Sequence, residues 1–385
     1  MSVVIPTHNP RSDYLARVIE ALRQQTLPRE QWELVVVDNG SRVPLAESIR
    51  HAADGIQLEA KGIRHAADGK RQEASLPSHV PTFTPFTELE LGWHPTARMV
   101  REERLGRTFA RLRGFAEARG ELIVMVDDDN VLAPDYLANA VKIAEEHKDL
   151  GAFGGKCLPE FETQPEPWME EFLPLLALRD HGEKEIIAGD SRAADGSRRV
   201  YPDQAAPIGA GMVVRSSAAA AYAEGIAQRA CGIRHTAYGR TAEDENSLKH
   251  CPTETPSHRA ASVLTDRRGD SLASAGDNDL VFTILRDGWK VGYFPQLKVT
   301  HLIPSSRLTV DYFARANHGV QRSWVEVLRK HEACPWLVAP KWSAPLRQIK
   351  ALLFIRPWHG KRAYVRWQGV CGRILGTTVL HSKLR

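Results

Sequence analysis

The chain has 385 residues, of which 43% are hydrophobic and 25% charged, and its mean hydropathy is −0.34. These ordinary globular values exclude a disordered or fibrous chain, and the length suffices for one large domain or two. The net charge of +4 conceals an asymmetry, because residues 333–385 carry ten Lys or Arg and no Asp or Glu. Residues 1–332 therefore hold 41 basic and 47 acidic side chains, a mildly acidic body before a strongly basic tail.

Three further features narrow the class of protein. No apolar run approaches the roughly 18–20 residues that a membrane-spanning helix needs. The amino-terminal segment is too short and uncharged for a secretory signal. Five scattered cysteines suit a reducing compartment better than a disulfide framework. We therefore expect a cytoplasmic protein.

Strand and helix signals alternate through the first 150 residues. β-branched and apolar runs predict strands at 2–5 (ended by Pro6), 33–37, 97–101 and 122–126, and helical spacing predicts helices around 15–22 and over 108–118. This alternation implies right-handed crossovers and a mostly parallel sheet, the α/β class.

The second half has a mixed α+β pattern. The sequence predicts a glycine-punctuated strand at 208–214, helices at 216–224 and 277–287, strands at 290–294 and 297–301, and a long helix at 309–330. We expect one domain over 1–332, with a ligand-binding half of about 1–150 and a second half of about 151–332, followed by a basic helical tail at 333–385.

Two stretches interrupt this rhythm and share a repeated peptide. Residues 49–55 recur verbatim at 63–69, and 62–69 match 232–239 at six of eight positions. We interpret about 49–90 and 227–262 as surface insertions, which cost little stability as loops lengthen. The second insertion contains Cys231, His235, His250 and Cys251, but without paired Cys-x-x-Cys spacing we expect no zinc site there.

An acidic triplet follows the strand at 122–126. Asp127, Asp128 and Asp129 fall at a strand's carboxyl end, as do Thr7 and Asp38, and ligands of open α/β sheets bind at that edge. Clustered carboxylates favour a hard cation such as Mg²⁺ or Mn²⁺, which commonly shares its coordination with substrate phosphates. Neither a phosphate-binding P-loop motif nor a Gly-x-Gly-x-x-Gly turn is present.

Six motifs in order resemble those of family 2 glycosyltransferases with the GT-A fold. They are SVVIPTHN at 2–9, VVVDNGS at 35–41, GRTFARLRG at 106–114, DDDN at 127–130, GAGM at 209–212 and AGDNDL at 275–280. The resemblance covers about 2–48, 96–225 and 263–325. It implies a Rossmann-like central sheet flanked by helices and a nucleotide-sugar donor.

The resemblance also implies roles for the nucleotide-binding residues. Pro6 and Thr7 would line the nucleotide pocket, and Asp38 would accept a hydrogen bond from a uracil ring. Arg111 would approach the nucleotide. From the residues alone, Asp38 is equally suited to an Asx turn.

The resemblance places a metal at the acidic triplet. Asp127 would point towards the ribose and Asp129 would bind the divalent metal, Mn²⁺ or Mg²⁺, while Asp128 can take either role because the triplet holds one extra aspartate. His301 would be a further metal ligand; its alternative is a hydrogen-bonded histidine on a strand.

Asp277 matches the position of the family's acceptor-activating base, although Gly276 replaces the acidic residue before it. Such a base takes the acceptor hydroxyl's proton while the metal neutralises the leaving group, and attack from the opposite side inverts the anomeric carbon. Asp277 is also suited to an ordinary helix N-cap. Leu112 stands where the family has Asn, and 321–324 only approximates a Gln-x-x-Arg-Trp motif.

The tail holds four of the nine tryptophans among its ten cations. Basic residues interleaved with aromatics fit nucleic acid or an anionic membrane surface, and tryptophan favours the membrane interface. We expect peripheral attachment to the inner face of the cytoplasmic membrane through 333–385, and no nucleic acid partner.

These patterns predict a metal-dependent, inverting glycosyltransferase. It would move one hexosyl or N-acetylhexosaminyl unit from a UDP-linked sugar to a cell-envelope glycan or lipid-linked acceptor. The alternatives are a GT-A-like sugar-phosphate nucleotidyltransferase and a non-catalytic nucleotide-sugar or nucleic-acid binding protein. A processive synthase is disfavoured because channel helices are missing.

Overall fold

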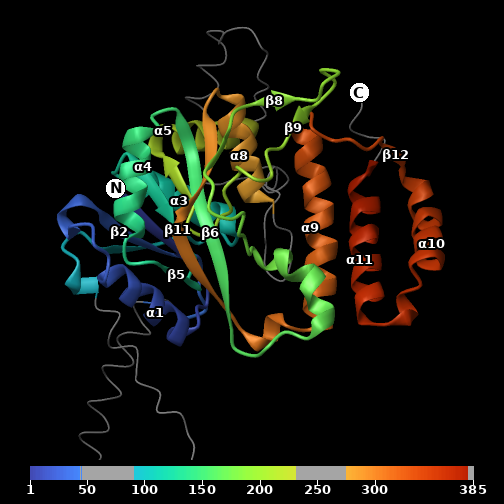
Figure 1. The fold of residues 1–385 in the computed structure, drawn as a ribbon, viewed down its shortest axis with the longest axis horizontal. Helices are drawn as coiled ribbons and strands as arrows, with labels where there is room; N and C mark the ends of the chain where they lie inside the picture. The colour runs from blue at the N-terminus through green and yellow to red at the C-terminus, as the bar shows by residue number, and fades with distance from the viewer. Residues whose placement is uncertain (44, 46–90, 231–274, 380–385) are drawn as a thin grey trace, which may run out of the picture.

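In the computed structural model, a nine-stranded sheet forms the centre of the molecule (Figure 1). The structure describes residues 1–43, 45, 91–230 and 275–379. The first predicted insertion and all but the start of the second, including the four Cys and His residues considered for zinc, lie outside the described residues. The strand order is β3-β2-β1-β4-β10-β6-β11-β5, and β7 pairs with β11.

The first four strands of this order are parallel. They are β1 (Ser2–Thr7), β2 (Glu33–Asp38), β3 (Arg98–Arg101) and β4 (Leu122–Met125). Their apolar residues alternate between the two faces of the sheet, as buried strands require. Because parallel strands end at one edge, Thr7 and Asp38 are register partners there.

The other strands make the whole sheet mixed. β10 (Val213–Arg215) runs antiparallel to β4 and β6 (Leu150–Phe161), while β6 and β11 (Lys290–Ile303) are parallel. The short strands β5 (Asn130–Leu132) and β7 (Ile186–Ala188) pair antiparallel with β11. The predicted α/β class is confirmed, with the parallel pairing concentrated in the amino-terminal half.

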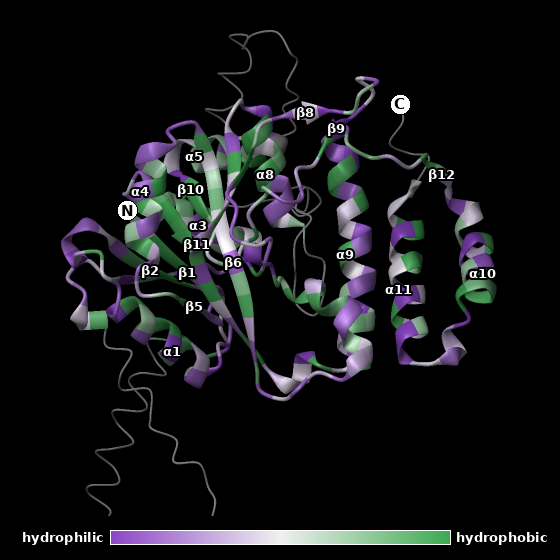
Figure 2. Ribbon diagram, viewed as in Figure 1, coloured by the Kyte–Doolittle hydropathy of each residue, from purple (hydrophilic) through white to green (hydrophobic). Residues whose placement is uncertain are grey.

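Helices cover both faces of the sheet. One face packs against α1 (Ser12–Arg23) and α4 (Tyr136–Glu146). The other face packs against α3 (Arg107–Glu117), α5 (Ser216–Ala230) and α8 (Gly276–Arg286). Figure 2 shows hydrophobic residues along the strands of the sheet and mixed hydrophobic and hydrophilic residues along the helices beside it.

Several sequence-based boundaries differ from the structure; the helix predicted at 216–224, for example, continues to Ala230. β1 continues through Pro6 to Thr7, because proline's fixed φ is compatible with extended backbone. Residues 208–212 are not part of a strand: Gly211 adopts φ +74°, and its carbonyl accepts the Tyr136 hydroxyl. The two strands predicted at 290–294 and 297–301 are one strand, β11, with an irregular register between Tyr293 and Lys298.

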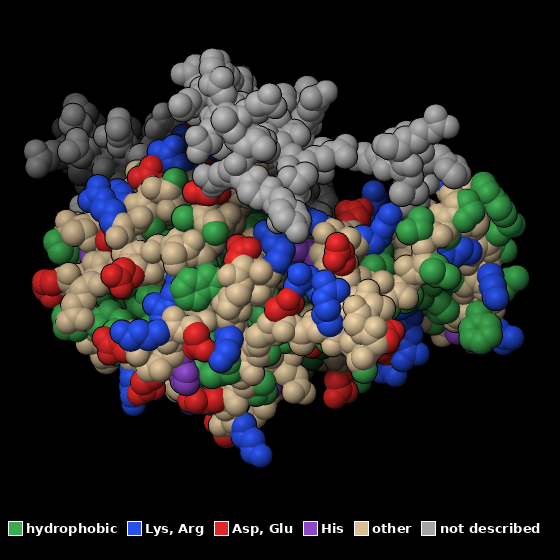
Figure 3. Space-filling view, turned by 90° about the horizontal axis from the view of Figure 1, so that it is seen from above, with side chains coloured by type: hydrophobic (Ala, Val, Ile, Leu, Met, Phe, Trp, Pro, Cys, Tyr) green, Lys and Arg blue, Asp and Glu red, His purple; other side chains and the backbone are tan. Residues whose placement is uncertain are grey.

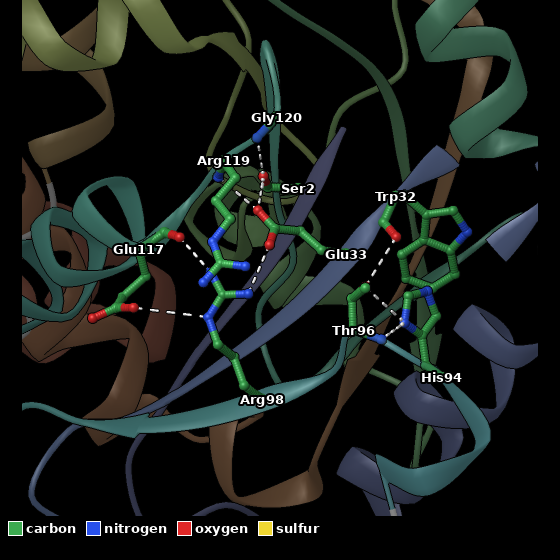
Figure 4. Close-up of polar contacts among 9 residues, drawn as sticks. All are labelled: Ser2, Trp32, Glu33, His94, Thr96, Arg98, Glu117, Arg119 and Gly120. Atoms are coloured by element: carbon green, nitrogen blue, oxygen red, sulfur yellow. Dashed lines mark hydrogen bonds and ion pairs between the residues drawn. The ribbon is translucent and has the colours of Figure 1, made fainter. Parts of the chain in front are cut away.

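A buried network joins the amino ends of the strands, at the edge opposite Thr7 and Asp38 (Figure 4). Glu33 accepts hydrogen bonds from Ser2 Oγ (2.6 Å), the Arg119 amide (2.6 Å) and Arg98 Nη1 (2.6 Å). Burial by itself raises the pKa of Glu33, but these donors outweigh it and lower the pKa. The rings of Trp32 and His94 pack beside the network, tilted by 55° and with centroids 4.2 Å apart. This edge of the sheet is therefore closed by packing, which leaves the carboxyl edge for a ligand.

The carboxyl-terminal helices pack beside the sheet domain. α9 (Val310–Lys330) contacts α11 (Lys361–Gly376) and the 3₁₀ helix η3 (Pro167–Leu176), and α10 (Ala344–Ile355) lies on the outer side of α11 (Figure 1). The predicted helical tail is confirmed. None of the helices in the described part of the chain has the length and apolarity needed to cross a bilayer.

Short elements complete the described chain. They are the 3₁₀ helices η1 (Arg29–Gln31), η2 (Leu91–Trp93), η4 (Ser305–Arg307), η5 (Lys341–Ser343) and η6 (Pro357–His359), and the strands β8 (Ser191–Arg192), β9 (Arg199–Val200), β12 (Ala339–Pro340) and β13 (Thr378–Val379).

Candidate active site

Asp38 ends β2 as a buried carboxylate with two partners. Its Oδ1 accepts the Ser41 amide (3.0 Å) and its Oδ2 pairs with Arg101 Nη1 (2.7 Å). The Ser41 amide is three residues on, one more than in the Asx turn considered from the sequence. Pro6, one residue before the end of β1, is buried opposite Val37. Asp38 is therefore held rigidly at the edge of the sheet, next to Thr7.

The acidic triplet begins where β4 ends. Asp127 Oδ2 forms an ion pair with Arg107 Nη2, and the Thr7 hydroxyl donates to Asp128 Oδ2. Burial raises the pKa of Asp128, and the neighbouring charge of Asp129 raises it further, to about 7. The triplet therefore does not hold three full negative charges at neutral pH.

Asp129 and His301 converge on one cation. The Asp129 side chain is 11% exposed, and its Oδ2 lies 2.9 Å from Arg307 Nη2 and 3.3 Å from His301 Nε2. Arg307 Nη1 is also 3.2 Å from His301 Nε2. Burial alone would raise the pKa of Asp129, but His301 and Arg307 lower it well below the usual range. β11 pairs with β5 so that His301 stands opposite Asn130, which explains how residues so distant in sequence meet.

Asp277 lies in the first turn of α8 and pairs with the buried Arg111. Arg111 Nη1 forms an ion pair with Asp277 Oδ1, and the Gly209 amide donates to Oδ2 (3.0 Å). A Cβ at position 209 would lie 2.4 Å from Arg111 Nη2 and 2.6 Å from Asp277 Oδ2, so a side chain there would displace the ends of this ion pair. Burial by itself raises the pKa of Asp277, but Arg111 and Arg107 overcome it and hold the pKa at about 2. Ala275 is the N-cap of α8 and Asp277 is the second residue of the helix, so Asp277 does not occupy the N-cap position considered from the sequence.

Helix α3 connects the acidic triplet with Asp277. Arg107 and Arg111 are four residues apart and therefore lie on one face of the helix, one turn from each other. Arg107 pairs with Asp127, and Arg111 pairs with Asp277. Side chains 150 residues apart in sequence are thereby joined through one helix face, and 21% of the Asp277 side chain remains accessible to a substrate.

Arg111 carries a feature that the sequence did not reveal. Its side chain is 6% exposed, and its Nε and Nη2 atoms have no hydrogen-bond partner within the described ranges. A buried guanidinium with unused donors is costly, and this cost falls when an anion such as a phosphate oxygen binds.

Sequence reasoning missed three arginines and one asparagine at the site. Arg101, Arg107 and Arg307 supply the cations that the carboxylates required, but nothing in the sequence paired them. The Asn39 side chain holds the segment before α3 by donating to the Glu102 and Arg104 carbonyls and accepting the Gly106 amide. Asn39 could have been selected from the sequence because it lies within the motif at 35–41.

The donor atoms of this site fit a divalent metal in part. One carboxylate oxygen of Asp129 and the Nε2 of His301 already converge on a positive group, and such oxygen and nitrogen donors suit Mn²⁺ or Mg²⁺. Asp127 turns instead to Arg107. Across the described residues, three or more His, Cys, Asp or Glu side chains nowhere gather as a metal site.

The fold defines the class of protein, an open α/β type whose ligands bind at the carboxyl edge of the parallel strands, where the charged residues described above lie. The sequence then gives the family. The model of glycosyl transferase family 2 matches residues 2–72 and 88–201, and the chain belongs to this family.

A curated relative is the glucosyl-dolichyl phosphate glucuronosyltransferase of Haloferax volcanii. It is 30% identical over 82 residues, which is 21% of this chain. The matched stretch spans about a quarter, 26%, of that relative's length.

Similar solved structures share little sequence with this chain. The mannosyltransferase PcManGT from Pyrobaculum calidifontis, in complex with GDP-Man and Mn²⁺, aligns with a TM-score of 0.43 and 16% identity, covering 96% of this chain and 73% of its own. Residues 1–349 of TarS from S. aureus align with a TM-score of 0.39 and 12% identity, covering 97% and 88% respectively.

Proposed function

We propose that this family 2 glycosyltransferase moves one sugar from a nucleotide-diphosphate sugar, UDP-linked, to an acceptor hydroxyl with inversion of the anomeric carbon. The transferred unit is a hexosyl or N-acetylhexosaminyl group. The supporting observation is the pairing of Asp127 and Asp277 with two arginines one turn apart on α3.

Asp277 is the proposed catalytic base. It is ionised at neutral pH and partly exposed, so it can accept the proton of an acceptor hydroxyl. In the present geometry Arg111 keeps it a weak base. A diphosphate that draws the unused donors of Arg111 would loosen this ion pair and raise the basicity of Asp277 as the donor binds.

The remaining residues of the site hold the donor. Asp129 and His301 are the residues that would bind a divalent metal, with Asp127 as a further ligand, and the bound metal would neutralise charge on the diphosphate leaving group. Pro6, Thr7, Asp38 and Asp128 would line the nucleotide side. Thr7 is the register partner of Asp38 and donates a hydrogen bond to Asp128 of the triplet, which supports this assignment.

The acceptor is proposed to be a cell-envelope glycan or a lipid-linked sugar at the inner face of the cytoplasmic membrane. The Haloferax volcanii relative is named for glucosyl-dolichyl phosphate, which supports a lipid-linked acceptor. Attachment would run through the basic tail, residues 333–385.

The variant Asp277→Asn tests the mechanism directly. A thermal-shift screen of nucleotide sugars with Mn²⁺ would first identify the donor, because ligand binding raises apparent stability. We then expect nucleotide release from that donor to fall by about 100-fold or more in Asp277→Asn, with donor affinity kept within a few-fold.

Asp287→Asn is a matched control, since Asp287 caps the far end of the same helix and pairs only with its neighbour Arg286 among the described residues. Unchanged turnover in Asp277→Asn would remove the proposed mechanism. Release of pyrophosphate in place of a nucleoside diphosphate would identify a nucleotidyltransferase.

A further inference from the structure

Helix α10 presents an apolar face to the outside of the molecule. Leu346, Ile349 and Leu353, spaced by three and four residues, are each more than half exposed, and Phe354 is 86% exposed. Trp342 and Trp358, in the 3₁₀ turns before and after the helix, are exposed by 72% and 62%. We call these six side chains the α10 patch. Figure 3 shows apolar side chains gathered at this edge of the molecule, with Lys and Arg beside them.

The opposite side of α10 makes its contact with the protein. Ala344 is buried, and Leu352 is partly buried. Arg347 Nη1 donates to the Thr377 hydroxyl (3.1 Å), beyond the end of α11. A surface helix ordinarily turns its apolar face to the core and its polar face to water. α10 instead exposes a second set of apolar side chains on its outer side, and contiguous exposed apolar surface of this kind marks an interaction site.

The cations of the tail divide between two roles. Three on α11, Lys361, Arg362 and Arg366, form ion pairs with Glu166 and Glu171 at η3, so they help attach the tail to the body. Three others, at and beside α10, are exposed and have no ion pair with any described residue: Lys341, Lys350 and Arg356.

We propose that α10 lies flat in the headgroup region of an anionic bilayer. The α10 patch would face the hydrocarbon, while Lys341, Lys350 and Arg356 would contact anionic headgroups. This inference rests on the proposed membrane attachment and names the element responsible for it, which is α10 alone rather than the whole basic tail.

The helix has the dimensions and composition of an interfacial segment. Its 12 residues span about 18 Å, too little to cross a bilayer. An exposed apolar face flanked by cations is the pattern of helices that lie in the interface plane. Tryptophans stand at both ends of the patch, and their rings favour headgroup depth.

The charges favour a bilayer over a second copy of the chain. In a symmetric dimer the same patch meets itself, which would bring each cation of one copy close to those of the other. Residues 333–385 contain no Asp or Glu that could neutralise them. An anionic lipid surface supplies the missing charge.

Vesicle flotation with the full chain tests the proposal. Wild-type protein should bind phosphatidylcholine vesicles containing phosphatidylglycerol, and more weakly as salt rises. The double variant Leu346→Ser/Leu353→Ser should bind at least about tenfold more weakly, because each lost apolar side chain removes that order of partitioning. The affinity of Lys350→Gln/Arg356→Gln for the same vesicles should fall by about fivefold per removed charge, and its affinity for pure phosphatidylcholine vesicles should not change.

Ile187→Ser/Val200→Ser is the matched control, since both residues are exposed apolar side chains elsewhere in the protein, by 38% and 36%. It should bind as wild type does. Equal flotation of the α10 double variant and wild type would overturn the proposal. The proposal would also be overturned if sedimentation equilibrium showed a wild-type dimer that the α10 double variant does not form, while neither protein binds vesicles.

The same samples separate this proposal from the proposed catalytic function. The α10 variants should keep the donor-induced thermal shift of wild type, because none of the altered residues lies at the candidate active site. If the wild-type protein binds vesicles but shows no thermal shift with any nucleotide sugar, the transferase assignment alone is refuted. Intact donor binding with no flotation would refute the α10 proposal alone.

Discussion

At the residue scale, the pair of Arg111 and Asp277 determines how basic the proposed catalytic carboxylate is. Burial favours the neutral form of Asp277, and the adjacent guanidinium outweighs it, leaving a pKa of about 2. We expect Arg111→Met to raise this pKa by about 1–3 units, because burial is then opposed only by the charge of Arg107. The acid limb of the pH profile of donor turnover should move to higher pH by the same amount.

A helix neighbour provides the control for this shift. Arg113 lies on α3 but pairs with Glu117 and is 41% exposed. Arg113→Met should leave the acid limb where wild type has it. Arg111 is also expected to contact the donor, so Arg111→Met should lower turnover at every pH. The test is therefore the pH at which the acid limb falls, and the maximum rate is not used. An unmoved limb in Arg111→Met would show that Arg111 does not set the protonation of Asp277.

The carboxylates of the site could be predicted from the sequence, and their partners could not. Asp38 and Asp127 follow apolar strands directly, and strand ends of one parallel block meet at one edge. Arg307 follows a strand too, but its contact with Asp129 depends on the pairing of β5 with β11, which no local pattern encodes. Three adjacent carboxylates repel one another and require a positive charge nearby, but the sequence does not indicate which residue supplies it.

At the scale of elements, an ion pair between helices fixes the start of α8, which carries Asp277. Asp279 is 5% exposed and contacts Lys330 Nζ (2.6 Å) at the end of α9 and His331 Nε2 (2.7 Å) just after it. Burial would raise the pKa of Asp279, but His331 and Lys330 lower it to about 2. Asp279→Asn should therefore lower the free energy of unfolding by about 3–5 kcal/mol at pH 7, because the buried carboxylate that Lys330 and His331 both contact loses its charge.

The pH dependence of this loss has a definite sign. The folded-state pKa of Asp279 lies below its ordinary value of about 3.9, so its stabilisation is complete above about pH 4 and disappears as the pH falls towards 2. Denaturant titrations from pH 7 down to pH 3 should show wild type approaching Asp279→Asn. Asp287→Asn at the exposed end of α8 should cost less than about 0.5 kcal/mol throughout. A difference that does not shrink with falling pH would contradict the ion-pair explanation.

Strands were more predictable than turns at this scale. The runs at 33–37 and 122–126 are apolar and β-branched, so their burial followed from composition. The run at 208–214 has similar composition, but Gly211 takes a left-handed φ, and Val299 and Tyr136 fill the space that a Cβ would need there. That contact comes from two other segments of the chain, and only the tertiary structure reveals it.

At the scale of the whole molecule, the acidic body and the basic tail meet in a local group of ion pairs. Lys361 and Arg366 of α11 meet Glu166 and Glu171 of η3, at side-chain exposures between 38% and 52%. Exposed ion pairs of this kind contribute at most about 1 kcal/mol each. They orient the tail on the body, and the close packing of α11 against α9 must supply most of the attachment energy.

Gly372 provides the test of that packing. A Cβ at this position would lie 2.1 Å from the His318 carbonyl oxygen on α9, a backbone atom that cannot move aside cheaply. Helix propensity alone would make Gly372→Ala stabilising by about 1 kcal/mol. We expect the opposite sign, a loss of about 1–3 kcal/mol in the free energy of unfolding, because overpacking dominates. Gly92→Ala, whose added Cβ would meet no atom of the described residues within 4 Å, is the matched control, and Arg366→Gln should cost less than about 1 kcal/mol. An unchanged or raised melting temperature in Gly372→Ala would mean that ion pairs, rather than packing, hold the tail to the body.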